Sequence, residues 1–174
     1  MLEMIVSMGV FSIAVLIAVG SLLALTNAQK KALVLQSTQD NLRFALETMA
    51  RDIRTGDLYH CADDVVLTRV DCASGNDIFT FLNASGATVT YKASGNRILR
   101  SINGGVTFDP TTSSDITIEY LLFFVIGSPE DDGTPGGDKF HPRVTIVAKG
   151  VSGSGASRSE LNLQTTVSQR KIQR

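Results

Sequence analysis

The sequence predicts an α+β protein in which one long N-terminal helix packs, by its second half, on a predominantly antiparallel β-sheet. Residues 4–29 contain no charged residue and no proline, which is typical of a continuous apolar helix. After Gly56, short apolar runs alternate with turn-forming residues, which is typical of hairpins. We divide the chain into an apolar segment (residues 1–29), an amphipathic segment (30–55) and a β-rich head (56–174).

Composition and charge argue against some classes of function for this chain. Its 174 residues have a formal net charge of −1, so no excess of positive charge is present to bind a phosphate backbone, and nucleic acid is disfavoured as the main partner. His60 and His141 lie in unlike contexts, with no Ser, Cys or Asp in a recognisable catalytic order. We therefore expect a protein that is not an enzyme and needs no cofactor.

The apolar segment is too long for a secretory signal peptide, whose apolar core covers about 7–15 residues after a basic start. Residues 4–29 as a helix would reach roughly 39 Å at about 1.5 Å per residue. A bilayer core is about 30 Å thick. We therefore predict a membrane-spanning helix that stays in the mature protein and crosses the membrane once.

The helical pattern continues into the amphipathic segment. Arg43 with Glu47, and Glu47 with Arg51, are four residues apart on its exposed flanks, and Gly56 predicts a left-handed stop. The predicted helix thus runs from near Met1 to near Thr55, about 80 Å. Its apolar stripe consists of Ala28, Ala32, Leu35, Leu42, Leu46, Met49 and Ile53. We expect the part of this stripe from Leu35 onward to pack across one face of the sheet as the core of the head.

Glu3 is a carboxylate at the start of the apolar run. An ionised group in hydrocarbon costs several kcal/mol, and residues of this kind usually mark function. One interpretation is a polar end at the headgroup level. The other is a pairing group whose charge is compensated when another chain supplies a positive partner.

The N-terminal residues resemble those of type IV pilins and type II secretion pseudopilins, whose precursors carry G-F-T-L-x-E before the same apolar helix. The matching run is Met1-Leu2-Glu3-Met4-Ile5-Val6-Ser7, followed by Met8 to Leu25. Leu2 matches the x and Glu3 the glutamate, whereas Met1 stands where the motif has Leu. The G, F and T, with the basic leader and the prepilin-peptidase cleavage site, would precede Met1, through an earlier start codon or because the chain was trimmed.

Three later stretches are similar to W-class minor pilins and J-class pseudopilins. These are the helix end Ala45–Arg54, a hairpin within Val89–Gly105 that includes Tyr91, Gly95, Arg100 and Gly104, and the ending Leu163–Arg170. The resemblance is specific over the first 55 residues and looser beyond them.

The resemblance implies how the subunit assembles. Glu3, flanked by Leu2 and Met4, would accept the N-terminal amine of a neighbouring subunit, and the apolar helices would bundle as a filament core. An ion pair of this kind costs about 3–5 kcal/mol to break when it is buried. Gly9 and Gly20 would permit close approach or a local loosening of the helix; an alternative for Gly20 is an ordinary small residue of a membrane helix.

The sequence of the head predicts a series of short strands. Leu121 to Ile126 is continuously apolar, which predicts a central strand covered on both sides or a strand with one face against a second subunit. Gly150 to Ser159, rich in Gly and Ser, predicts a flexible loop. The predicted strands are Val65–Arg69, Ile78–Leu82, Thr88–Lys92, Arg97–Ile102, Asp115–Ile126, Arg143–Lys149 and Glu160–Ser168, with turns at Asn83–Gly86, Ser94–Asn96 and Asn103–Gly105.

Cys61 and Cys72 are close enough in sequence for a disulfide, which suits a head outside the cytoplasmic membrane. Two unpaired thiols are the alternative, and with His60 they are too few for a zinc site. A turn-rich loop carries four carboxylates whose spacing does not match an EF-hand. These acids, Glu130, Asp131, Asp132 and Asp138, are weak calcium candidates on a loop that is usually only solvated.

We therefore expect a minor pilin or pseudopilin subunit of a type IV pilus or type II secretion pseudopilus. Its partners would be membrane lipid before assembly, the inner-membrane assembly platform, prepilin peptidase on the precursor, and other subunits. One alternative is an anchored binding or adhesion module, which exposed aromatics near the acidic loop would favour. Another is a competence pseudopilin that aids DNA uptake, which would need Lys139, His141, Arg143, Lys149 and Arg158 on one side.

Overall fold

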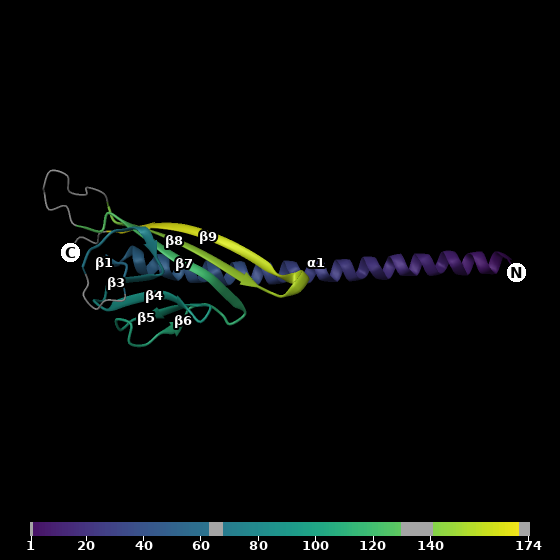
Figure 1. Cartoon of the computed structure of the whole chain (residues 1–174), viewed down its shortest axis with the longest axis horizontal. Coiled ribbons are helices and arrows are strands. Elements are labelled where there is room, and N and C mark those ends of the chain that lie inside the picture. The colour runs from purple at the N-terminus through teal and green to yellow at the C-terminus, as the bar shows by residue number, and fades with distance from the viewer. Residues whose placement is uncertain (1, 63–67, 130–140, 171–174) are drawn as a thin grey trace.

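The computed structural model describes residues 2–62, 68–129 and 141–170. One helix, α1 (Leu2–Arg54, 53 residues), runs from the N-terminus into the head and protrudes from it by its N-terminal half (Figure 1). Antiparallel strands lie along its C-terminal half. The predicted α+β class and the single long helix are confirmed.

The strands form two sheets, where the sequence had predicted one. In the described residues, the first sheet has the order β1-β3-β4-β5-β6 and the second β2-β7-β8-β9. The first consists of β1 (Asp57–His60), β3 (Ile78–Leu82), β4 (Thr88–Ser94), β5 (Arg97–Ser101) and β6 (Asp109–Pro110). The second consists of β2 (Cys72–Asn76), β7 (Ile116–Ile126), β8 (Arg143–Ser152) and β9 (Ser159–Ser168).

The predicted strands from Ile78 onward are all present, whereas β1, β2 and β6 were not predicted. These three are short and lack the alternating apolar pattern that identifies a strand in a sequence. Of the predicted strand Val65–Arg69, positions 65–67 lie outside the described residues, and Thr68 and Arg69 are not in a strand. The β4–β5 turn occurs where predicted, with φ of 57° at Gly95 and 63° at Asn96.

Strand β7 is an interior strand of the second sheet, between β2 and β8. Leu121, Phe123 and Val125 are buried on its inner face, while Leu122 and the alternate residues after it are half-buried. Its inner face contacts β3, β4 and β5 of the first sheet. The central-strand interpretation therefore holds for one face fully and for the other only in part.

The second half of α1 packs mainly against β8 and β9. Leu42, Leu46, Met49 and Ile53 of the predicted stripe are buried, and Ala45 joins them. Leu35 does not, because 42% of it is exposed: the first buried residue of the helix is Thr38, so Leu35 precedes the part that the sheet covers. The stripe was therefore correct from Leu42 onward and wrong at Leu35.

Gly56 follows the helix for a reason other than the predicted left-handed conformation. Its φ is not positive; the residue with positive φ is Leu58, at 57°. A β-carbon at position 56 would lie 2.5 Å from the Phe81 ring. A glycine is thus needed here because the helix end passes over an aromatic ring.

The predicted flexible loop at Gly150–Ser159 is shorter than expected. Strand β8 continues to Ser152, pairing Gly150 with Leu161, and a short 3₁₀ helix, η1 (Gly155–Ser157), forms the turn. A β-carbon at Gly150 would lie 2.7 Å from Leu42 Cδ1. The glycine therefore allows close packing against the helix and does not mark flexibility.

Candidate functional site

The N-terminal tip of α1 carries the residues predicted to act in assembly. Glu3 lies in the first turn and is exposed, between Leu2, which is 81% exposed, and Met4. Ser7 Oγ donates a hydrogen bond to the backbone oxygen of Glu3 at 2.8 Å, and no ion pair to the Glu3 carboxylate occurs within the described part of the chain. This carboxylate is therefore available to a group from another molecule. Met1 lies outside the described residues.

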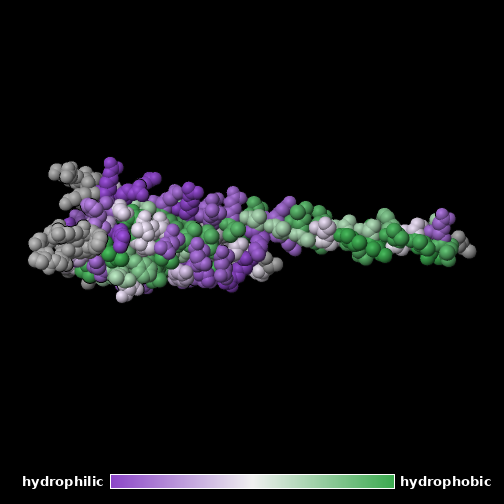
Figure 2. All heavy atoms as spheres, turned by 90° about the horizontal axis from the view of Figure 1, so that it is seen from above, coloured by the Kyte–Doolittle hydropathy of each residue, from purple (hydrophilic) through white to green (hydrophobic). Residues whose placement is uncertain are grey.

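The protruding half of α1 is apolar on all sides and uncovered. It is long and apolar enough to cross a membrane, and its most apolar 18-residue window has no buried residue. Figure 2 shows hydrophobic residues almost continuously along this half, in contrast to the mixed surface of the head. So large an exposed apolar surface requires lipid or other apolar helices to cover it.

Gly9 and Gly20 lie on this uncovered half. The helix is regular at both positions, and no atom approaches within 4 Å of a β-carbon placed there. The structure therefore shows no kink at either glycine. Both leave an open surface that another helix could approach closely.

Comparisons with family models, with curated proteins and with solved structures find no match to this chain. The architecture is nevertheless pilin-like, with a long apolar N-terminal helix packed on antiparallel sheets and a disulfide in the head.

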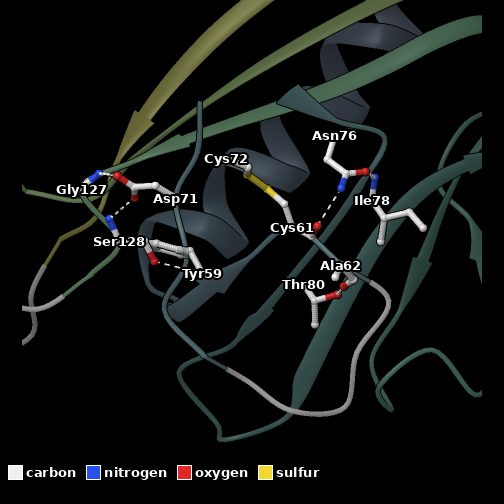
Figure 3. The surroundings of a disulfide bond; sticks show 10 residues. All are labelled: Tyr59, Cys61, Ala62, Asp71, Cys72, Asn76, Ile78, Thr80, Gly127 and Ser128. Carbon is white, nitrogen blue, oxygen red and sulfur yellow. Dashed lines mark hydrogen bonds between the residues drawn. A yellow bond between two sulfur atoms is a disulfide. The ribbon is translucent and has the colours of Figure 1, made fainter. Parts of the chain in front are cut away.

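The predicted disulfide is present between Cys61 and Cys72, whose Cα atoms lie 6.2 Å apart. Cys61 directly follows β1, an edge strand of the first sheet, and Cys72 begins β2, an edge strand of the second. The bond therefore joins the two sheets (Figure 3). A disulfide also suggests that the head lies outside the cytoplasm.

Polar side chains around the disulfide hold neighbouring segments of the head together (Figure 3). Asn76 Nδ2 donates to the Cys61 carbonyl at 2.7 Å, and Thr80 Oγ1 donates to the Ala62 carbonyl at 2.9 Å. The Asp71 carboxylate accepts bonds from the N–H groups of Gly127 and Ser128 at 3.1 and 2.7 Å. Hydrogen bonds to Asp71, the residue before β2, therefore hold it beside the residues that follow β7, in addition to the disulfide at Cys72.

A second polar cluster connects α1 to the first sheet. Asp52 Oδ2 accepts a bond from the Tyr91 hydroxyl at 2.7 Å and from Arg100 Nε at 3.0 Å. Burial and the Asp52 carboxylate both raise the pKa of Tyr91, which therefore stays a neutral donor. These three residues lie in the stretches that carry the resemblance, but sequence spacing could not show that they meet.

A third cluster lies at the start of β1, just after the C-terminal end of α1. The Asp57 carboxylate accepts two bonds from Arg69 Nη2, at 3.0 and 2.9 Å, and one from the Leu58 N–H at 2.8 Å. Burial alone would raise the pKa of Asp57, but the bonds from Leu58, Arg69 and Gln169 outweigh it and lower the pKa. No sequence motif had indicated this cluster, because its members are far apart in the chain.

His60 is buried, and neither ring nitrogen has a hydrogen-bond partner among the described residues. It pairs with Thr80 of the neighbouring strand β3, within the first sheet, and directly precedes Cys61. No described residue brings a second chemical group to this histidine, while His141 is exposed just before β8.

Among the described residues, the basic side chains that the DNA-uptake alternative would require do not gather as a free patch. Lys149 Nζ pairs with Glu119 at 2.7 Å and Glu160 at 3.2 Å, and Arg158 pairs with the same two acids. Arg143 lies at the other end of β8. Lys139 and the calcium candidates Glu130, Asp131, Asp132 and Asp138 lie outside the described residues.

The acidic loop of the adhesion alternative lies outside the described residues, and the exposed aromatic residues of the head that are described lie elsewhere in the chain. Tyr120, 39% exposed, lies toward the start of β7, whereas the acidic loop follows its end at Ile126. Phe44, 64% exposed, lies on α1. Neither is close in sequence to the acidic loop.

Proposed function

We propose that this chain is a minor pilin or pseudopilin subunit, a structural protein held in the inner membrane by α1 before assembly and in a filament afterwards. The observation that carries the proposal is the uncovered apolar half of α1, which bears a single carboxylate at its tip and a disulfide-linked head at its other end. Lipid covers this half before assembly and neighbouring helices cover it afterwards.

In this role Glu3 sets the axial position of each subunit, by pairing with the N-terminal amine of its neighbour. The free-energy cost of removing the carboxylate from water is offset only by the charge of that amine together with further hydrogen bonds. The residues beside it, Leu2 and Met4, pack against the neighbouring helix. The assembly platform and the prepilin peptidase are the membrane partners of this route.

The test is Glu3→Ala in cells that assemble the filament, with Glu47→Ala as a control that removes the same charge from the exposed face of the same helix. We expect Glu3→Ala to insert in the membrane normally and to disappear from sheared filaments, because the carboxylate acts only between subunits. Glu47→Ala should be recovered like the unmodified protein. Equal recovery of all three proteins would refute the pairing role of Glu3.

A further inference from the structure

The β8–β9 turn is the part of the head that lies nearest the apolar segment. Figure 1 shows this turn, around η1, projecting furthest along α1 toward the N-terminus. A β-carbon at Gly153 would lie 3.1 Å from Val34 Cγ1, so the turn meets the helix at the level of Val34. The uncharged run ends only five residues earlier, at Gln29.

That separation matches the thickness of a headgroup layer. Five helical residues rise about 7.5 Å, and the polar headgroup region of each leaflet is about 5–8 Å thick. An apolar helix of roughly 39 Å also exceeds a core of about 30 Å, and tilting, one way to accommodate the excess length, would lower one side of the head toward the lipid. The turn therefore lies at the outer surface of the bilayer when the apolar segment spans it.

The residues at this level suit anionic headgroups. Lys30 and Lys31 are exposed and form no ion pair with any described residue. No carboxylate occurs on α1 between Glu3 and Asp40, or in the turn at positions 153–158. The exposed side chains of Leu33 and Leu35 follow the lysines, at the depth where an apolar group can enter the interface.

The turn itself is compact and can rest on a surface. Ser157 Oγ and the Ser157 N–H both donate to the Ser154 carbonyl, at 2.9 and 3.1 Å. Arg158 adds a cation, which is paired with Glu119 and Glu160 and remains half exposed. Asp115 lies nearby, since Ser152 Oγ donates a hydrogen bond to its backbone carbonyl. Because acidic residues surround Arg158, the turn alone carries little net charge. The two lysines therefore supply the attraction to anionic headgroups.

We propose that the β8–β9 turn and Lys30 and Lys31 form a docking surface for anionic lipid headgroups of the bilayer that the apolar segment spans. The contact sets the height and tilt of the head before the subunit leaves the membrane. It rests on the proposed function, because it requires the apolar segment to span the bilayer.

The test uses the full chain in vesicles, with one fluorophore attached to Ser154→Cys and lipids that carry a quencher on the headgroup. The same fluorophore on Ser85→Cys is the control, since the β3–β4 turn lies beyond the end of α1, about 33 Å further along the axis. We expect strong quenching at position 154 and none at position 85. Quenching at 154 should be greater in vesicles with phosphatidylglycerol than in phosphatidylcholine alone.

Removing the lysines should separate the attraction from mere proximity. In the anionic vesicles, the double variant Lys30→Gln with Lys31→Gln should have a lower ratio of heads in contact with the bilayer to heads away from it. We expect this ratio to fall by about fivefold for each lysine removed. Arg51→Gln with Arg54→Gln removes the same charge from the distal end of α1 and should change nothing. Equal quenching in both lipids, or no effect of the lysine variant, would overturn the proposal.

Two outcomes keep this proposal distinct from the proposed function. Alkaline extraction of the vesicles reports whether the chain is integral to the bilayer. A chain that resists extraction but shows no quenching at position 154 overturns the docking surface and leaves the membrane anchor standing. A chain that is extracted overturns the anchor itself, and the docking surface with it.

Discussion

Gly56 shows how a single position can be required for packing. The helix ends at Arg54, and the chain then passes so close to Phe81 that only a glycine fits. The residue type is the one expected after a helix, but the cause is a contact between segments that are far apart in sequence.

Gly56→Ala should destabilise the head by about 1–3 kcal/mol, because the added methyl overlaps the Phe81 ring. The neighbouring exposed Thr55→Ala should change the free energy of unfolding by less than about 0.5 kcal/mol. Combining Gly56→Ala with Phe81→Leu in a double-mutant cycle, measured by urea unfolding, should show favourable coupling. Strictly additive changes in the free energy of unfolding would mean that the Phe81 ring is not the reason for a glycine at position 56.

Asp57 makes the end of α1 sensitive to acid. Because its pKa is lowered in the folded state, its stabilisation is complete above the ordinary carboxyl value of about 3.9 and is lost as the pH falls through the lower folded value. The pair with Arg69 is partly exposed, so we expect its contribution to stay below about 1 kcal/mol.

Thermal unfolding between pH 7 and pH 2 tests whether the stabilisation by Asp57 is lost at low pH. Asp57→Asn should lower the melting temperature at pH 7. Below about pH 3, the melting temperatures of the variant and the unmodified protein should lie closer together. A constant difference at every pH would exclude the carboxylate charge as the cause. Asp40→Asn, on the exposed face of α1, is the matched control.

At the scale of elements, α1 has two different surfaces within the head. Leu46 is 7% exposed and faces the sheets, whereas Phe44 faces solvent only two residues away. The same substitution at these positions therefore separates burial from helix propensity.

Leu46→Asp should cost more than about 4 kcal/mol, because it removes an apolar group and buries a charge. That is enough to unfold a domain whose whole stability is about 5–15 kcal/mol. Phe44→Asp should change stability by less than about 0.5 kcal/mol. Melting curves of residues 30–174 would test both, and similar curves for the two variants would place the helix elsewhere than on the sheets.

At the scale of the whole molecule, the head and the apolar segment are structurally separate. The first buried residue of α1 is Thr38, after half-buried Val34. The core of the head therefore takes nothing from residues 1–29.

Deleting residues 1–29 should leave the melting temperature of the head unchanged and make it soluble without detergent. Deleting residues 1–40 also removes Val34 and Thr38, and should lower the melting temperature by a few degrees, at about 2–4 °C per kcal/mol. Circular dichroism on both fragments gives the comparison. A head that unfolds after the shorter deletion would show that the apolar segment contributes to its core.

The amino-acid sequence by itself determined the long helix, its apolar first half, the strands from Ile78 onward and the Cys61–Cys72 disulfide. Each depends on a local pattern or on residues close in the chain, such as the absence of charge between Glu3 and Lys30.

Only the tertiary structure decided that the strands form two sheets, that the disulfide joins them, and that Asp52 meets Tyr91 and Arg100. It also decided that Leu35 stays uncovered and that the β8–β9 turn lies beside Val34. The physical reason is that strand pairing and helix docking bring together residues that are far apart in the chain, and their positions follow from packing of the whole core, which no local period records.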